Sequence, residues 1–95
     1  MRLVWLQRAR ANRKNAIAWI ARENPIAAVS QLNEILLQTG RLAEYPEMGR
    51  PGRQRGTREL VVNRTPFIIV YRIRPRAGRI EILRVMHGAQ QRPEG

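Results

Sequence analysis

A chain of 95 residues without cysteine predicts one domain, and it excludes disulfide bonds, thiolate catalysis and cysteine metal sites. Eighteen lysine and arginine residues against seven acidic ones give a formal net charge of +11, and every basic residue except Lys14 is arginine. Because guanidinium groups match phosphates and carboxylates, we expect a negatively charged partner, which could be nucleic acid, the ribosome or an acidic polypeptide.

The N-terminal segment, MRLVWLQRARANRK, is interrupted early by charges and is unlike a secretory signal. No segment approaches the roughly 20 consecutive apolar residues of a membrane helix. We therefore expect a cytoplasmic protein with no membrane partner. Genome base composition together with solubility stays open as another explanation for the arginine content.

The first part of the chain predicts a short strand followed by a helix. Residues 2–6 (RLVWL) are apolar and β-prone, which indicates the strand. Helical spacing begins near Gln7 and ends near Glu23, and its apolar residues are Ala16, Ile17, Trp19, Ile20 and Ala21. For Trp5 and Trp19 we expect core positions rather than stacking on nucleic-acid bases.

A second helix follows a break at Asn24-Pro25. Asparagine is a good N-cap and proline is tolerated at the first helical position, so the helix begins there and runs to about Glu44. Its core-facing residues recur at spacings of three and four: Ala28, Val29, Leu32, Ile35, Leu36, Thr39 and Leu42. The short turn between the helices predicts an antiparallel helical hairpin.

The rest of the chain predicts a loop, three strands and a tail. Residues 45–57 hold two prolines and three glycines and form a basic loop. Strands are expected at residues 58–63, 67–74 and 79–87, and their short links favour an antiparallel meander. The middle strand opens with an unbroken apolar run, which is typical of burial on both faces. The polar residues 88–95 predict a flexible tail.

This order of elements, β-α-α-β-β-β, predicts an α+β fold. We expect the helical hairpin to pack on one face of a twisted antiparallel sheet, within a single domain covering residues 1–95. The N-terminal strand should join an edge of the sheet.

The runs EYPEMGRPG, GTREL, IVYRI and IEILRVMHGAQQ follow one another in an order and spacing that resemble the RelE/ParE toxin superfamily, ParE branch. The opening, VWLQRARANRKNAIAWIARENPIAAVSQL, is similar to the strand–helix–NP–helix start of that branch, so the resemblance covers nearly the whole chain. It implies a plasmid-stabilisation toxin of a type II toxin–antitoxin system, held in a hetero-oligomer by an acidic, ParD-like antitoxin. The ParE branch implies DNA gyrase as the target, and the RelE branch implies cleavage of mRNA on the ribosome.

Residue by residue, the resemblance favours the gyrase branch. RelE-like proteins carry lysines and arginines on the central strands, where this chain has the apolar Leu60, Val62 and Ile68. The position after the last strand is Gln90, which is neutral, and no tyrosine follows Tyr71. RNA cleavage needs an acid and a base, and that set is incomplete here.

Two alternatives stay open. An endoribonuclease would use Arg58, Arg84 and His87, because histidine is the commonest acid–base group, although the sequence favours His87 as a strand-end residue bonded to neighbouring backbone. A general nucleic-acid binder would reveal itself by a steep salt dependence.

For the favoured function, we expect target binding rather than catalysis. Strand arginines are held in fixed order, whereas a charged loop is often only solvated surface. The expected target-binding residues are Arg50, Arg53, Arg55, Arg58, Arg72, Arg84 and Gln90. Tyr71 should be a core residue with its hydroxyl at the rim.

We expect the antitoxin to cover an apolar groove between the helical hairpin and the sheet, by helix-in-groove docking or strand addition. No metal or other cofactor is expected, since the chain has one histidine, no aspartate and no cysteine. Ser30 is the only serine and lies on the second predicted helix, which argues against a serine–histidine–acid triad.

Overall fold

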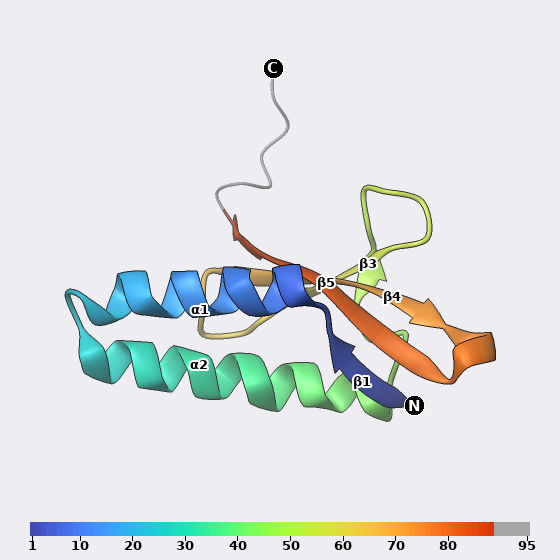
Figure 1. Cartoon of the computed structure of the whole chain (residues 1–95), viewed down its shortest axis with the longest axis horizontal. Helices are drawn as coiled ribbons and strands as arrows, with labels where there is room; N and C mark the ends of the chain where they lie inside the picture. The colour runs from blue at the N-terminus through green and yellow to red at the C-terminus, as the bar shows by residue number, and fades with distance from the viewer. Residues whose placement is uncertain (89–95) are drawn as a thin grey trace, which may run out of the picture.

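The computed structural model describes residues 1–88, in which two helices pack against one sheet (Figure 1). In chain order the elements are β1 (Arg2–Trp5), α1 (Gln7–Ala21), α2 (Pro25–Gly40), the 3-10 turn η1 (Arg41–Ala43), β2 (Arg50–Pro51), β3 (Arg58–Val61), β4 (Phe67–Arg74), the 3-10 turn η2 (Pro75–Ala77) and β5 (Arg79–His87). The α+β class, the helical hairpin and the three C-terminal strands are therefore confirmed. The loop predicted between helix and strand also contains the short strand β2, which the sequence pattern did not indicate.

The start of the second helix, α2, is capped as the sequence predicts. Asn24 lies at the N-cap of α2, and its Oδ1 accepts a hydrogen bond from the N–H of Ala27 at 3.0 Å. Pro25 occupies the first helical position, where its missing N–H costs nothing. The helix ends at Gly40, earlier than expected, and the chain continues as the 3-10 turn η1.

The five strands lie in the order β1-β5-β4-β3-β2. The N-terminal strand occupies an edge, as expected, but it runs parallel to β5, from the pair Arg2–Arg79 to the pair Trp5–Ile82. The expected antiparallel meander of β3, β4 and β5 is confirmed, and the parallel pairing of β1 makes the sheet as a whole mixed. The helical hairpin explains this, because it returns the chain to the start of β1, where the N-terminal ammonium donates to the Ala43 carbonyl at 2.8 Å. After the hairpin, the strands β3, β4 and β5 alternate in direction, and β5 runs in the same direction as β1.

The core lies between the helices and one face of the sheet. It contains Ala9, Ile35 and Leu42 from the helical layer and Leu60, Val62, Phe67, Ile69, Tyr71, Ile80, Ile82 and Val85 from the sheet side. The first five residues of β4 are all buried, which confirms the expectation from its apolar run. Trp5 is half-buried against this core, with the guanidinium of Arg13 lying 4.4 Å from its ring.

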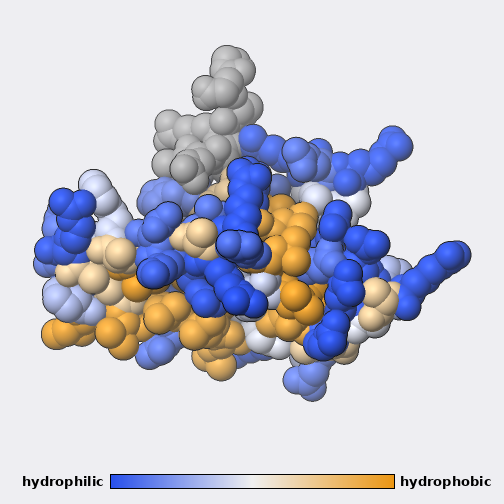
Figure 2. Space-filling view, in the orientation of Figure 1, coloured by the Kyte–Doolittle hydropathy of each residue, from blue (hydrophilic) through white to orange (hydrophobic). Residues whose placement is uncertain are grey.

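Three apolar helical residues expected in the core are exposed. Trp19 is 67% exposed, Val29 61% and Leu36 44%. The turn between α1 and α2 lies away from the strands in Figure 1, so the sheet does not cover this end of the hairpin, where Trp19 and Val29 lie; Leu36 is nearer the other end of α2. Figure 2 shows apolar atoms gathered along the hairpin as a result.

The C-terminal tail predicted for residues 88–95 falls almost entirely outside the described residues. Gly88, its first residue, donates its N–H to the Pro66 carbonyl at 2.6 Å and continues the contact between β4 and β5. None of the helices within residues 1–88 combines the length and the apolar character that crossing a membrane requires.

Candidate functional site

The register of the strands assigns each side chain to one of two sheet faces. Tyr71 pairs with Ile82, and both belong to the core beneath the helices. Val70 pairs with Arg84, and because neighbouring residues of a strand alternate, this pair points to the opposite face. We call that opposite surface the arginine face, and it carries Arg50, Glu59, Val70, Arg72, Arg74, Arg79, Glu81, Arg84 and Met86.

One end of the arginine face is organised around the buried carboxylate of Glu81. Arg72 Nε lies 2.7 Å from Oε1, and Arg79 Nη2 lies 2.7 Å from Oε2. Arg74 Nη1 is a more distant neighbour, at 3.7 Å from Oε1. Hydrogen bonds from Arg72 and Arg79 lower the pKa of Glu81 below its usual 4.5, so the group is ionised at neutral pH. One negative charge shared among these arginines leaves this end of the face positive.

A second buried carboxylate, Glu59, organises the opposite end. Its Oε1 lies 3.2 Å from Arg50 Nη2, and its Oε2 accepts the backbone N–H of Arg53 at 3.2 Å. The loop between β2 and β3 is closed by a hydrogen bond from the Gly52 N–H to the Thr57 carbonyl at 2.8 Å. The loop arginines are therefore attached to the sheet at a defined place.

Arg84 reaches the arginine face because of an irregularity in the sheet. The register between β4 and β5 shifts at Val70 and Tyr71, so that Leu83 has no counterpart on β4. Such a β-bulge turns the residues that follow it to the other face. The Arg84 Nη2 group lies 3.0 Å from the sulfur of Met86, two residues further along the same strand.

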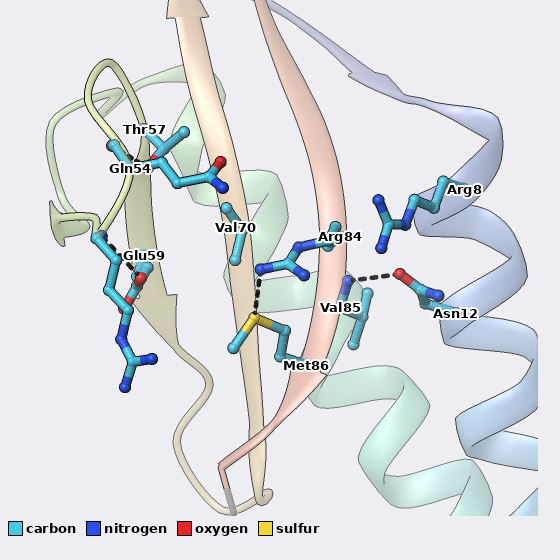
Figure 3. A pocket seen from close by; sticks show the side chains of 10 residues that line it. Arg8, Asn12, Gln54, Thr57, Glu59, Val70, Arg84, Val85 and Met86 are labelled. Carbon is cyan, nitrogen blue, oxygen red and sulfur yellow. Dashed lines mark hydrogen bonds between the residues drawn. The ribbon is translucent and has the colours of Figure 1, made fainter. Parts of the chain in front are cut away.

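A cavity of about 600 Å³ lies over the middle of the arginine face, next to α1 (Figure 3). Its walls come from α1, from the β2–β3 loop and from β3, β4 and β5, and its lining residues are Arg8, Asn12, Arg53, Gln54, Thr57, Glu59, Val70, Arg84, Val85 and Met86. Because β1 pairs only as far as Ile82, the β5 edge is free beyond it, and Asn12 Oδ1 accepts the N–H of Val85 at 3.2 Å. That bond fixes α1 beside the cavity.

The structure brings together most of the expected target-binding residues. Arg50 and Arg72 lie on the arginine face, Arg53 and Arg84 line its cavity, and Arg55 is exposed on the adjoining loop. Two expected residues are not part of this group. Arg58 points to the other side of the sheet, and Gln90 lies outside the described residues.

Arg58 has a different environment because it pairs with Tyr71 rather than with Val70. Its Nη1 donates to the Gly49 carbonyl at 2.7 Å and also to the Glu47 carbonyl at 3.4 Å. These contacts hold the loop before β2 in place. The three residues of the nuclease alternative are thus separated, since Arg58 and Arg84 lie on opposite faces of the sheet.

His87, the third of those residues, lies at the end of β5. Its ring meets that of Phe67 edge-on, with centroids 5.9 Å apart. It lines a separate groove of about 560 Å³ between the helical hairpin and the sheet, together with Asn12, Asn15, Ala16, Trp19, Ile20, Gln31, Pro66, Phe67 and Val85. The lining of this groove is mainly apolar, and it lies where we expected the antitoxin to bind.

Tyr71 is a core residue, as expected, but its hydroxyl is not at the rim. The side chain is fully buried, and the hydroxyl donates to the Pro46 carbonyl at 2.7 Å and accepts the Gly49 N–H at 2.9 Å. Burial raises its pKa above the usual 10.0 of tyrosine. Together with Arg58, it therefore fixes the segment that leads into β2.

Sequence reasoning missed the two carboxylates that organise the face, as well as Arg8 and Arg79. An indication existed for Arg79 and Glu81, because residues two apart on a strand share a face. None existed for Arg8, whose place depends on how α1 lies against the β5 edge. Within residues 1–88, no three histidine, aspartate or glutamate side chains lie close enough to hold a metal ion.

Comparisons with known proteins agree with this geometry. Residues 3–92 match the family model described as the ParE toxin of the type II toxin–antitoxin system parDE. The chain is 43% identical to the Y4kP protein of Sinorhizobium fredii, which is named as a toxin, over 98% of this chain and 94% of that protein.

Two solved structures share the fold. A chain of the chromosomal ParDE toxin–antitoxin system from P. aeruginosa matches with a TM-score of 0.81 and 27% identity, over 92% of this chain and 95% of that one. A chain of the RelBE2 toxin–antitoxin complex from Mycobacterium tuberculosis matches with a TM-score of 0.60 and 22% identity, over 90% and 88% respectively. The protein belongs to the ParE toxin family of type II toxin–antitoxin systems.

Proposed function

We propose that this toxin inhibits DNA gyrase by binding to it through the arginine face, and that an acidic antitoxin neutralises it. The observation that carries the proposal is the gathering of arginines from β2, β4 and β5 on the one sheet face that the helices leave uncovered. A positive surface of this kind attracts an acidic protein or a protein–DNA complex and increases the rate of association. The net charge of +11 acts in the same direction.

The chemistry of the face supports binding rather than RNA cleavage. Cleavage through the 2′-hydroxyl needs one group that accepts a proton and another that donates one. Glu81 is held ionised by Arg72 and Arg79 and has no proton to donate near neutral pH. His87 lines the groove on the helical side and does not line the cavity that Arg84 lines, although the two adjoin at Asn12 and Val85.

The double variant Arg50→Gln with Arg72→Gln tests the gyrase proposal. Both side chains are partly exposed on the arginine face, at 50% and 41%, so their removal should reduce potency in a gyrase supercoiling assay at least tenfold. The matched control, Arg22→Gln with Arg41→Gln, removes the same charge from the exposed helical layer and should stay within twofold of the wild type. Circular dichroism checks that both variants are folded. Cleavage of mRNA on ribosomes, with no effect on supercoiling, would contradict the proposal and favour the endoribonuclease.

The antitoxin part of the proposal rests on the groove between the helical hairpin and the sheet. Trp19 lines this groove together with the apolar Ala16, Ile20 and Phe67, and Trp19 is 67% exposed. Exposed apolar side chains gathered in a groove of a small protein are typical of a partner site. The ParDE match supports an antitoxin as the partner, and the basic charge of this chain favours an acidic segment.

Trp19→Ser should weaken binding of the cognate antitoxin at least tenfold, because an exposed aromatic side chain in a groove is a common anchor of interfaces. Inhibition of gyrase should be unchanged, since Trp19 lies away from the arginine face. Tyr45→Ser is the matched control, because Tyr45 is 61% exposed but lies outside the groove. Isothermal titration calorimetry measures the affinities. Equal effects of the two substitutions would show that the groove is not the antitoxin site.

A further inference from the structure

We propose that the cavity on the arginine face binds single-stranded nucleic acid, with Arg8, Arg53 and Arg84 holding the phosphodiester groups. The sugar or base of an unpaired nucleotide would lie on the apolar floor formed by Val70 and Met86. The inference rests on the proposed function and deepens it, since gyrase acts while bound to DNA. It names a contact with the nucleic acid in addition to contacts with the enzyme.

The three arginines come from separate parts of the chain. Arg8 belongs to α1, Arg53 to the β2–β3 loop and Arg84 to β5, and all three line the same cavity; Figure 3 shows Arg8 and Arg84 on neighbouring elements. Each of these segments is fixed by a contact described above: the bond between Asn12 and Val85, the bond from the Arg53 N–H to Glu59, and the β-bulge. Groups held in place before binding lose less entropy when a ligand arrives.

The cavity arginines also differ from the others in their partners. Arg50, Arg72 and Arg79 each form an ion pair with a buried carboxylate. Among residues 1–88, neither Arg8 nor Arg84 lies within ion-pair distance of a carboxylate, and Arg84 contacts the thioether of Met86, which is a weak acceptor. The guanidinium donors at the cavity are therefore available to an incoming anion.

Glu59 is the carboxylate that lines the cavity, and its position does not oppose an anion there. Its Oε1 accepts from Arg50 Nη2 and its Oε2 from the Arg53 N–H, so both oxygens face donors of the chain itself. Glu59 is also only 6% exposed, whereas Arg8 and Arg53 are exposed and Arg84 is partly exposed. The accessible charge of the cavity is positive.

Size and lining favour a nucleotide over a lone carboxylate. A volume of about 600 Å³ matches pockets that hold a whole small molecule, and it is too small to enclose a double helix. Val70 and Met86 line the cavity with apolar atoms. A carboxylate gains nothing from contact with them, whereas the apolar faces of a sugar or base can pack against them. Unpaired bases stack on guanidinium planes, and positively charged grooves hold the backbone of single strands.

Fluorescence anisotropy with a short labelled single-stranded DNA tests the inference. We expect binding that weakens steeply with salt, by a slope of about −0.7 in log K against log salt for each phosphate contact. Arg8→Gln with Arg84→Gln should weaken binding at least tenfold and make the slope shallower by about 1.4, which corresponds to the loss of two such contacts. The control, Lys14→Gln with Arg76→Gln, removes equal charge from exposed positions outside the cavity and should change binding less than twofold.

Parallel binding measurements with other polyanions identify the class of ligand. RNA of the same sequence and duplex DNA are measured in parallel, and both single strands should bind more tightly than the duplex. Poly-L-glutamate is added as a competitor and should displace the DNA only weakly. The inference is overturned if the wild type does not bind, if the control variant loses as much affinity as the cavity variant, or if poly-L-glutamate or duplex DNA binds as tightly as the single strand. Because gyrase is absent from this assay, a failure here with retained supercoiling inhibition removes the cavity site and leaves the proposed function intact.

Discussion

Replacing Tyr71 with phenylalanine should lower the free energy of unfolding by about 2–3 kcal/mol, a large share of the stability of so small a domain. The ring fits as before, but the buried Gly49 N–H and the Pro46 carbonyl both lose their partner. An unpaired buried polar group costs more than a hydrogen bond contributes. Urea unfolding followed by circular dichroism measures the change. Tyr45→Phe is the matched control, because Tyr45 is 61% exposed, and it should have little effect.

The same contact can be tested from its other side with Gly49→Ala. A Cβ on Gly49 would lie 2.7 Å from the Tyr71 hydroxyl and 2.9 Å from the Glu59 carbonyl oxygen, so the segment would have to move. We expect a loss of stability at least comparable to that of Tyr71→Phe. The double variant should lose less than the sum, since both changes break the hydrogen bond between Gly49 and Tyr71, although the contacts of the new Cβ with the ring and with the Glu59 carbonyl remain. Fully additive losses would mean that the two residues act separately.

The raised pKa of Tyr71 adds a pH dependence. Because the pKa is higher in the folded than in the unfolded state, the stabilisation is complete below pH 10.0 and is lost as the pH rises through the folded value. The wild type should therefore lose stability at alkaline pH by a component that is missing in Tyr71→Phe. If the free energy of unfolding of the two proteins decreased equally at alkaline pH, the result would argue against burial of this hydroxyl.

Replacing Glu81 with glutamine should destabilise the protein by about 1–2 kcal/mol at neutral pH. The substitution keeps the shape but leaves Arg72 and Arg79 without their charged partner, and it places an amide NH₂ against their donors. Partial exposure of the arginines limits the loss, because water screens their mutual repulsion. Glu23→Gln, at an exposed position near the turn between the helices, is the control and should have almost no effect. A negligible change in Glu81→Gln would show that the cluster is only a surface arrangement.

The pH dependence of the Glu81 effect has the opposite sign to that of Tyr71. The pKa of Glu81 is lower in the folded state, so its stabilisation is complete above pH 4.5 and is lost as the pH falls through the folded value. The difference in stability between the wild type and Glu81→Gln should accordingly decrease in acid. Thermal unfolding between neutral and strongly acidic pH measures this convergence, and a difference that grows in acid would contradict it.

The arginines of this protein thus serve two purposes that the sequence does not distinguish. Arg58, Arg72 and Arg79 bind carbonyls or carboxylates of the chain itself and stabilise the fold. Arg8 and Arg84 contact no carboxylate within residues 1–88 and are available to a partner. Arg50 and Arg72 belong to both groups, since they are partly exposed and also pair with Glu59 and Glu81, which is why the gyrase experiment includes a check of folding.

The sequence by itself determined the local elements. Apolar periodicity predicted both helices, Asn24-Pro25 predicted the start of the second, and residues 67–74 and 79–87 were predicted to be strands. These features depend on neighbours along the chain, such as the cap bond from Asn24 to Ala27, so local patterns are sufficient to specify them. The order and spacing of short runs over the whole chain were likewise enough to indicate the toxin family.

Only the tertiary structure decided which side chains share a surface. Strict alternation along β5 would place Arg84 on the same face as Ile80 and Ile82, but the extra residue Leu83 turns it to the arginine face. The parallel pairing of β1, the exposure of Trp19 and the approach of Arg8 to the cavity follow in the same way from how distant elements meet. These features are a β-bulge, the direction of an edge strand and the part of a helix that the sheet does not cover. Each arises from contacts between residues far apart in the chain, and a local sequence pattern does not contain such contacts.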